Sequence, residues 1–300
     1  MKLSVVLSVF NEEKKLARTL GSLSFADEII IVDNGSTDNT VAISKQYNAK
    51  IYQKVNNLML NLNKNFGFSK ASGDWILNLD ADEVVENNLK KEIDNVISKD
   101  EAEGFLIPRK NIIFNKWIKH SLWWPDYQLR LFKNGRGKFP CKHVHEMLSV
   151  DGRVLKLNNP LTHYNYESIS QFIYKLDKIY SENEAVHFIQ SGKSLHWLDL
   201  IRMPFADFIK TFFAQKGYLD GIHGLILSLL QAFYQIIVFA KIWEKKNFLV
   251  DEPNNLLKEF FGELGRMLKE FRYWKRTSQY EETVSPTQKL FLRIMRKLGL

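Results

Sequence analysis

The chain has 300 residues, of which 45% are hydrophobic and 13% aromatic, which is enough to bury a sizeable core and excludes disorder as the main state. The single cysteine, Cys141, excludes an intrachain disulfide, and nothing indicates an oxidising compartment. The formal net charge is +8, and residues 191–300 contribute +6 of it, with 17 Lys and Arg against 11 Asp and Glu. This basic surplus lies among Phe, Trp and Leu, which favours an anionic membrane surface over a nucleic-acid groove as partner.

The first ten residues are apolar over too short a stretch for a signal peptide. They run directly into three polar residues at 11–13 without a small-residue cleavage site. We therefore expect residues 3–10 to form a first strand and the protein to be cytoplasmic.

Strand and helix signals alternate over the next seventy residues. The predicted helices cover 11–23, 40–47 and 61–70, and the predicted strands that follow the first one cover 29–33, 50–53 and 75–79. Strands separated by single helices predict right-handed crossovers and a parallel sheet covered on both faces. The fold class is therefore α/β and Rossmann-like, and ligands in such sheets collect beyond the carboxyl ends of the strands.

The predicted secondary structure changes twice in the rest of the chain. Short β-like pieces at 104–108 and 127–132 predict antiparallel additions to the sheet, with long loops between them. From Ser168 onward the pattern is helical almost to the end. This predicts an α/β domain over residues 1–167 and a helical C-terminal extension over residues 168–300.

Two helical segments bear on membrane association. Residues 222–243 are strongly apolar, but polar residues interrupt the run, and a spanning helix needs about 20 nearly unbroken apolar residues. A buried or interfacial helix is therefore favoured over a spanning one. The last segment begins at Ser285 and Pro286 and separates Leu290, Phe291 and Ile294 from basic residues, the pattern of an in-plane membrane helix.

Three loops with polar residues follow the predicted strands, at 8–12, 33–38 and 80–83. The parallel topology predicts that they converge at one edge of the sheet. Asp33 lies at the end of its strand, where its carboxylate could accept hydrogen bonds from a base or a ribose. A simple helix cap by the residues after Gly35 would explain the same loop.

Asp80 and Asp82 stand one residue apart at the end of an apolar strand. Acids that emerge beside a desolvated core need a counter-ion, and Mg²⁺ or Mn²⁺ bridging to a diphosphate would supply one. The alternative is a pair of solvated loop carboxylates. His163 is a candidate further metal ligand or a packing residue, and Arg130 is a candidate phosphate ligand or a structural ion pair, because its guanidinium fork matches phosphate oxygens.

Several of these motifs, in this order and spacing, resemble the family-two glycosyltransferases with the GT-A fold. They are Ser-Val-Phe-Asn-Glu at 8–12, Val-Asp-Asn-Gly-Ser-Thr-Asp at 32–38, Asn-Phe-Gly at 65–67 with Ala-Ser-Gly-Asp at 71–74, and Leu-Asp-Ala-Asp-Glu at 79–83. The stretches 124–132, 139–146 and 217–221 are similar to the branch that includes bacterial lipopolysaccharide-core glucosyltransferases. The likeness covers about 240 residues.

The resemblance implies an inverting transferase with a nucleotide-diphospho-sugar donor, most often UDP-linked, and a lipopolysaccharide-core or other lipid-linked saccharide acceptor at the cytoplasmic face of the membrane. Under it, Asp82 would ligate the metal and Asp80 would lie near the ribose and the metal. The donor would lie among the following residues: Ser8, Asn11, Glu12, Asp33, Ser36, Asn65, Asp80 and Arg130.

Inversion by direct displacement needs a base that takes the proton of the acceptor hydroxyl while the metal stabilises the departing diphosphate. Glu146, which follows His143 and His145, is the preferred candidate. Asp126 is the alternative, because the tryptophans before it form a plausible platform for a sugar. A base elsewhere in the chain stays open.

Other functions fit less well. A sugar nucleotidyltransferase usually carries a Gly-rich, basic loop after its first strand, and residues 8–14 contain no glycine. A membrane-surface scaffold without turnover would keep the same pocket. A nucleic-acid-binding module is disfavoured because the basic residues lie on apolar helices rather than along a β platform. The sugar, the linkage and the oligomeric state are left open by these patterns.

Overall fold

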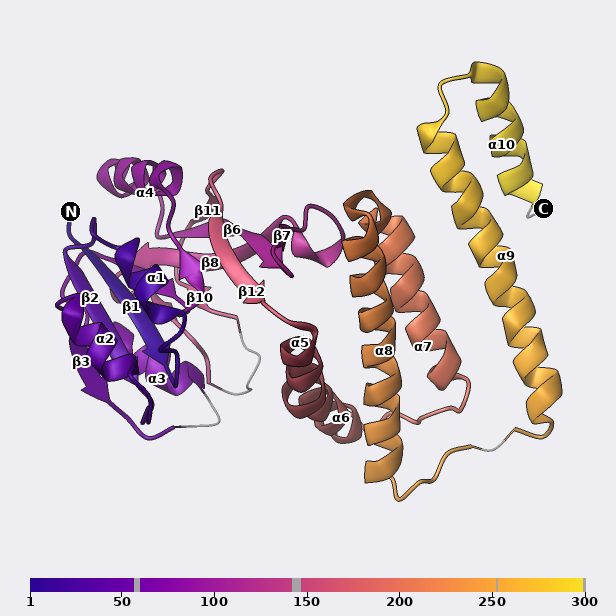
Figure 1. The fold of residues 1–300 in the computed structure, drawn as a ribbon, viewed down its shortest axis with the longest axis horizontal. Coiled ribbons are helices and arrows are strands. Elements are labelled where there is room, and N and C mark those ends of the chain that lie inside the picture. The colour runs from indigo at the N-terminus through magenta and orange to yellow at the C-terminus, as the bar shows by residue number, and fades with distance from the viewer. Residues whose placement is uncertain (57–59, 142–146, 252, 299–300) are drawn as a thin grey trace. The chain divides into compact units, whose positions relative to one another are not determined.

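The computed structural model describes residues 1–56, 60–141, 147–251 and 253–298. Two compact units are present (Figure 1). The first comprises Met1–Trp117 and Trp123–Asn165, and the second comprises Ile118–Leu122 and Tyr166–Leu300.

The first unit is built on a sheet whose N-terminal half is parallel. Its strands are β1 (Leu3–Val9), β2 (Glu28–Asp33), β3 (Lys50–Gln53) and β4 (Trp75–Leu79), in the order β3-β2-β1-β4. The helices between them are α1 (Leu16–Gly21), α2 (Thr40–Gln46) and α3 (Leu60–Phe68). Every residue of β4 is buried, as expected for a strand covered on both faces. The predicted α/β architecture is confirmed.

The second half of the sheet is mixed. Strand β8 (Asp126–Lys133) runs antiparallel to β4, and β6 (Gly104–Ile113) runs antiparallel to β8, with β12 (Leu161–Tyr166) and β5 (Glu83–Val84) beyond. Strand β6 extends past the predicted 104–108, because Arg109 pairs with Asp126 of β8, and Ile112 and Ile113 pair with β7. The smaller elements are β7 (Lys116–Trp117), β9 (Gly137–Lys138), β10 (Ser149–Val150), β11 (Val154–Lys156), α4 (Asn87–Lys99) and η1 (Ser121–Trp123).

Alternate side chains of the central strands form two cores, one on each face of the sheet. Val5, Leu7 and Leu77 belong to one cluster, and Val6 and Ile76 belong to the other. Helix α3 approaches the second face closely. A Cβ on Gly67 would come within 2.5 Å of a Val6 methyl carbon, so this position needs glycine. The close approach places the polar side of α3 beside the end of β4.

The second unit is helical. Helix α5 (Ile169–Lys175) continues through a π-helical turn, η2 (Leu176–Tyr180), into α6 (Ser181–Gln190), and α7 (Asp199–Phe208) continues into η3 (Ile209–Ala214). The turn η4 (Gly217–Asp220), α8 (Ile222–Lys245), α9 (Leu256–Glu282) and α10 (Pro286–Leu298) follow (Figure 1). Asp220 accepts hydrogen bonds from the backbone amides of Lys119 and His120, which ties residues 118–122 to this unit.

Helix α8 stands out by its composition. Among the described residues it is the one helix long and apolar enough to cross a membrane by length and composition, with a mean hydropathy of 1.9 over its most apolar window. Only 28% of that window is buried inside the structure.

Candidate functional site

The polar loops after β1 and β2 are joined by direct hydrogen bonds. The side-chain amide of Asn34 donates to Ser8 Oγ over 3.0 Å, and the backbone amide of Asn11 donates to Ser36 Oγ over 2.9 Å. The backbone amide of Thr37 donates in turn to Asn11 Oδ1 over 2.8 Å, and that of Glu12 donates to the Thr40 hydroxyl. The two loops therefore form one hydrogen-bonded wall.

The loop after β4 adjoins the same wall. Thr19 Oγ1, on α1, donates to the backbone carbonyl of Ala81, and Lys15 Nζ lies 3.5 Å from Asp82 Oδ2. The parallel register, which pairs Val9 with Asp33 and Leu7 with Leu79, confirms that the three loops converge at one edge of the sheet.

The Asp33 side chain accepts a hydrogen bond within its own loop. Its side chain is fully buried, and both carboxylate oxygens lie 3.3 Å from the backbone amide of Ser36. The neighbouring Asn34 is also buried and accepts a hydrogen bond from Asn63 on α3. Asp33 therefore closes this turn, which differs from the helix cap by residues after Gly35 that the sequence left open, and contact between Asp33 and a nucleoside stays a prediction.

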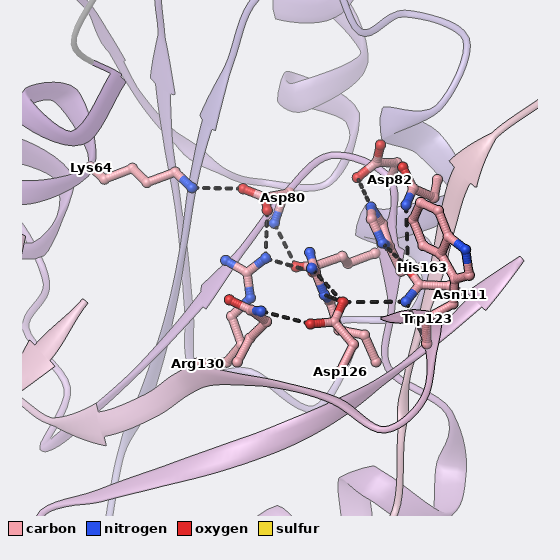
Figure 2. Close-up of polar contacts among 12 residues, drawn as sticks. Lys64, Asp80, Asp82, Asn111, Trp123, Asp126, Arg130 and His163 are labelled. Carbon is pink, nitrogen blue, oxygen red and sulfur yellow. Dashed lines mark hydrogen bonds and ion pairs between the residues drawn. The ribbon is translucent and has the colours of Figure 1, made fainter. Parts of the chain in front are cut away.

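Asp80 is held by two cations. Its carboxylate contacts Lys64 Nζ at 2.7 Å and Arg130 Nη2 at 2.5 Å (Figure 2). Glu83 is fully buried beneath it and accepts from both Arg130 and the backbone amide of Asp80. Burial raises the pKa of Asp80, but the charges of Arg130 and Lys64 outweigh it and hold the pKa well below its usual range. Asp80 is therefore ionised at neutral pH.

Asp126, at the start of β8, is engaged through both oxygens. Its Oδ2 contacts Arg109 Nη2 at 2.5 Å and also accepts from Asn111, while Oδ1 accepts from Gln128. Burial raises the pKa of Asp126, but Arg109 and the amides of Gln128 and Asn111 lower it below its ordinary value. A carboxylate with a lowered pKa is a weaker base. These contacts favour a structural role for Asp126 over proton transfer.

His163 lies beside Asp82. Strand β12 pairs antiparallel with β5, so that His163 is opposite Glu83 and its Nε2 is 3.5 Å from Asp82 Oδ1. Burial raises the pKa of Asp82, but the hydrogen bond and charge of His163 lower it below its ordinary value. The pairing therefore joins two of the predicted metal ligands from distant parts of the chain.

The other ring nitrogen of His163, Nδ1, contacts Asn111. Their Nδ1 and Oδ1 atoms are 2.7 Å apart (Figure 2). Asn111 Nδ2 donates to the backbone carbonyl of Trp123 and to Asp126, two groups that only accept, so Oδ1 is the atom that faces the imidazole. The ring then donates from Nδ1 and presents Nε2 to Asp82.

The remaining predicted residues lie around this cluster or outside the described ranges. Asn65 exchanges two hydrogen bonds of 2.9 Å with the backbone of Phe139, so it holds the segment that leads toward residue 142. Glu146, His143 and His145 lie outside the described residues, and the preference for Glu146 as base stays a prediction. In the part of the chain that the structure describes, no group of three or more His, Cys, Asp or Glu side chains is gathered as a metal site.

Several residues of the cluster were not singled out from the sequence as site residues. They are Lys15, Lys64, Glu83, Arg109 and Asn111. Arg109 and Asn111 had a usable signal, because residues two apart in a strand point to the same face of a sheet. Lys15 and Lys64 had none, since exposed helices carry lysine everywhere.

Comparison with known proteins agrees with this chemistry. Residues 4–149 match the family model described as glycosyl transferase family 2. An uncharacterized glycosyltransferase from Rickettsia felis is 30% identical over 260 residues, covering 81% of this chain and 90% of that protein. The lipopolysaccharide core biosynthesis glycosyltransferase LpsC of Rhizobium meliloti is 27% identical over 254 residues, covering 82% of this chain and 93% of that protein.

Among solved structures, Staphylococcus aureus TarS 1–349 in complex with UDP-GlcNAc is similar, with 18% sequence identity and a TM-score of 0.44 over 82% of this chain and 92% of that one. The family assignment rests on the family model and on the rickettsial relative, whose match extends over most of this chain and over nearly the whole length of that protein. The chain belongs to glycosyl transferase family 2 and is a glycosyltransferase.

Proposed function

We propose that this glycosyltransferase moves a hexose from a UDP-linked donor to a saccharide acceptor with inversion, using a divalent cation held by Asp82 and His163. The observation that carries the proposal is the juxtaposition of these two side chains at the end of β4. The two atoms that face each other are close enough to ligate one ion, and an oxygen with an imidazole nitrogen suits Mn²⁺. When bound, such an ion stabilises the negative charge that develops on the departing diphosphate.

The charges around this pair support a diphosphate. We define the carboxylate cluster as Asp80, Asp82, Glu83 and Asp126. Apart from His163, their ion-pair partners among the described residues are four cations, namely Lys15, Lys64, Arg109 and Arg130. The formal charges of the four carboxylates and of these four cations sum to zero. A diphosphate added alone would leave this region with an excess of negative charge, which a divalent cation offsets.

Two of the cations are suited to contact phosphate oxygens. Lys64 and Arg130 converge on the partly exposed carboxylate of Asp80. Arg130 makes its contacts to Asp80 and Glu83 through Nη2, so among the described residues Nη1 is left to donate to a phosphate oxygen. Because a guanidinium binds phosphate through paired N–H groups, Arg130 serves both as the ion-pair partner of Asp80 and as a donor toward the diphosphate.

The proton of the acceptor hydroxyl passes to a carboxylate on the far side of the sugar from the diphosphate. Glu146 is our preferred base, because the four donors around Asp126 leave that carboxylate a weak one.

The acceptor we propose is a lipopolysaccharide-core or other lipid-linked saccharide at the cytoplasmic face of a membrane. Similarity to LpsC supports it. Helix α10 supports it as well, since Leu290, Phe291 and Ile294 are exposed on a helix that also carries several Lys and Arg residues. We assign residues 1–167 to donor binding and catalysis and residues 168–300 to membrane association.

The first test is release of UDP from UDP-sugars, screened over common hexoses with Mn²⁺ and with and without acceptor. Asp82→Asn should lower acceptor-dependent release by about 100-fold or more, because a metal oxygen ligand and its charge are lost. The matched control is Asp151→Asn, which alters a side chain that is 86% exposed. Normal metal-dependent transfer by a folded Asp82→Asn variant would refute the metal assignment.

The same assay separates the alternatives. A sugar nucleotidyltransferase would release pyrophosphate from a nucleoside triphosphate and a sugar phosphate instead of UDP from UDP-sugar. A scaffold would bind UDP with no turnover on any acceptor.

A further inference from the structure

Helix α8 presents an apolar stripe outward. From residue 222 to residue 243 every exposed position of the helix is apolar: Ile222, Ile226, Leu229, Phe233, Ile236, Ala240 and Trp243. These positions recur at intervals of three or four residues, so they lie along one side of the helix. At 1.5 Å per residue the stripe is about 30 Å long. We call this set of residues the α8 stripe.

The polar side chains of α8 are used on the inner side. Gln231 and Gln235 both donate to Asp207 of α7, and Ser228 is buried. Near the end of the helix Lys241 pairs with Asp177 of η2. Gln231, Gln235 and Lys241 therefore each have a partner within the unit, although Gln235 Oε1 is a buried atom without one among the described residues. The outer side is left without a polar group between residues 222 and 243.

The inner side of α8 is apolar as well. Leu227, Val238, Phe239 and Ile242 are buried against the rest of the unit. A helix that is hydrophobic all round belongs in a protein core or in lipid. The outer side is exposed in the structure, and the described part of the chain does not cover it, so a partner outside this chain is needed.

The composition at the end of the stripe indicates lipid. Trp243 closes the stripe. Glu244, Lys245 and Lys246 follow it, and Lys245 pairs with Glu182, so the end of the stripe carries an aromatic residue and basic residues of the kinds found at headgroup level in membranes. A protein partner would be expected to meet polar groups at the rim of the contact. The net charge of +6 over residues 191–300 adds attraction to anionic headgroups.

The helices next to α8 indicate whether it spans the bilayer or lies parallel to its surface. Helices α6 and α7 pack against α8, and their exposed residues include Glu184 and His187 on α6 and Arg202 on α7. If α8 spanned the bilayer, these side chains would enter the hydrocarbon, where charged groups are costly. If α8 lies parallel to the membrane, only the stripe enters the lipid and the charged faces stay in water.

We propose that α8 lies in the plane of an anionic bilayer with the α8 stripe immersed at the boundary of headgroups and acyl chains. The inference rests on the membrane association included in the proposed function, and it assigns that association to an element other than α10.

The test is flotation of the full chain with vesicles of phosphatidylglycerol and phosphatidylcholine. Replacing Leu229 and Phe233 by Gln should weaken vesicle binding by about tenfold or more, since two large apolar side chains no longer enter the lipid. Both side chains are exposed, so the fold should persist, which circular dichroism verifies. The matched control replaces Val55 and Leu122 by Gln, two exposed apolar residues outside α8, and should stay within about twofold.

The depth of α8 residues in the bilayer distinguishes an in-plane helix from a spanning one. A polarity-sensitive dye on a cysteine introduced at residue 226, 233 or 243, in a Cys141→Ser background, should report one shallow depth at all three positions. A deep signal at residue 233 between shallow signals at the ends would overturn the in-plane arrangement in favour of a spanning helix.

Two further outcomes bear on the inference. Unchanged vesicle binding by the Leu229 and Phe233 variant would overturn it. Sedimentation showing a lipid-free dimer that this variant converts to a monomer would also overturn it and assign the stripe to a second copy of the chain. UDP release is measured on the same samples without vesicles, so a protein that binds lipid but lacks turnover contradicts the proposed function and leaves the α8 assignment intact.

Discussion

Asn111 Oδ1 lies 2.7 Å from His163 Nδ1 and thereby sets which nitrogen of the imidazole faces Asp82. The amide cannot turn over without placing its NH₂ group against the ring and its oxygen against the carbonyl of Trp123 and the carboxylate of Asp126. Partners of this kind fix the tautomer and the orientation of metal-binding histidines.

Replacing Asn111 by Leu should weaken Mn²⁺ binding by about 10- to 100-fold, because the imidazole loses the acceptor that orients it. Electron paramagnetic resonance of free Mn²⁺ measures the affinity without any turnover. The matched control is Asn95→Leu, at an exposed position of α4. Equal Mn²⁺ affinities for the parent and a folded Asn111→Leu variant would remove Asn111 from the site.

Lys64→Met tests the diphosphate contact. The substitution keeps an unbranched side chain of similar length and removes the charge that lies 2.7 Å from Asp80. We expect kcat/KM for the UDP-sugar to fall about 10- to 100-fold, the cost of losing a charged hydrogen bond. Lys91→Met, at an exposed position of α4, is the control. If kcat/KM is unchanged, Lys64 serves only as an ion-pair partner of Asp80.

The base is tested by a pair of isosteric substitutions. Glu146→Gln should lower kcat by about 10²–10⁴ with the fold intact, as loss of a general base does. Asp126→Asn should instead lower the melting temperature, because Arg109 loses its closest carboxylate. Kinetics and thermal unfolding of both variants distinguish the roles. A fully stable Asp126→Asn variant with a similar loss of kcat would move the base to Asp126.

The lowered pKa of Glu28 predicts that the stability of the fold depends on pH. Its pKa is lowered to about 2: burial raises it, but hydrogen bonds from Lys50, Ser4 and the backbone of Ser72 outweigh that effect. Because the folded pKa lies below the unfolded value, the stabilisation is fully present above the unfolded pKa of about 4.3 and is lost as the pH falls toward 2.

Glu28→Gln should therefore reduce the free energy of unfolding by about 2–3 kcal/mol at pH 7. The difference between the variant and the parent should shrink as the pH falls from 5 to 2. Urea unfolding at several pH values measures it, with Glu101→Gln, at an exposed loop position, as the control. A difference that does not vary with pH would show that the carboxylate charge makes no contribution.

The sequence by itself determined the sheet and the edge at which the site lies. Alternating strands and helices imply parallel crossovers, and an apolar run that ends in Asp80 and Asp82 places carboxylates at the end of β4. These inferences succeed because hydrophobic period and strand length are local properties of the chain.

Only the tertiary structure decided which side chains meet. The pairing of β12 with β5 brings His163 to Asp82, and the register of β6 on β8 sets Arg109 against Asp126, so that one candidate base lies in an ion pair. The polar residues of α8 likewise point inward to Asp207 and Asp177. Strand partners and helix faces depend on contacts between residues far apart in the chain, and no local pattern records them.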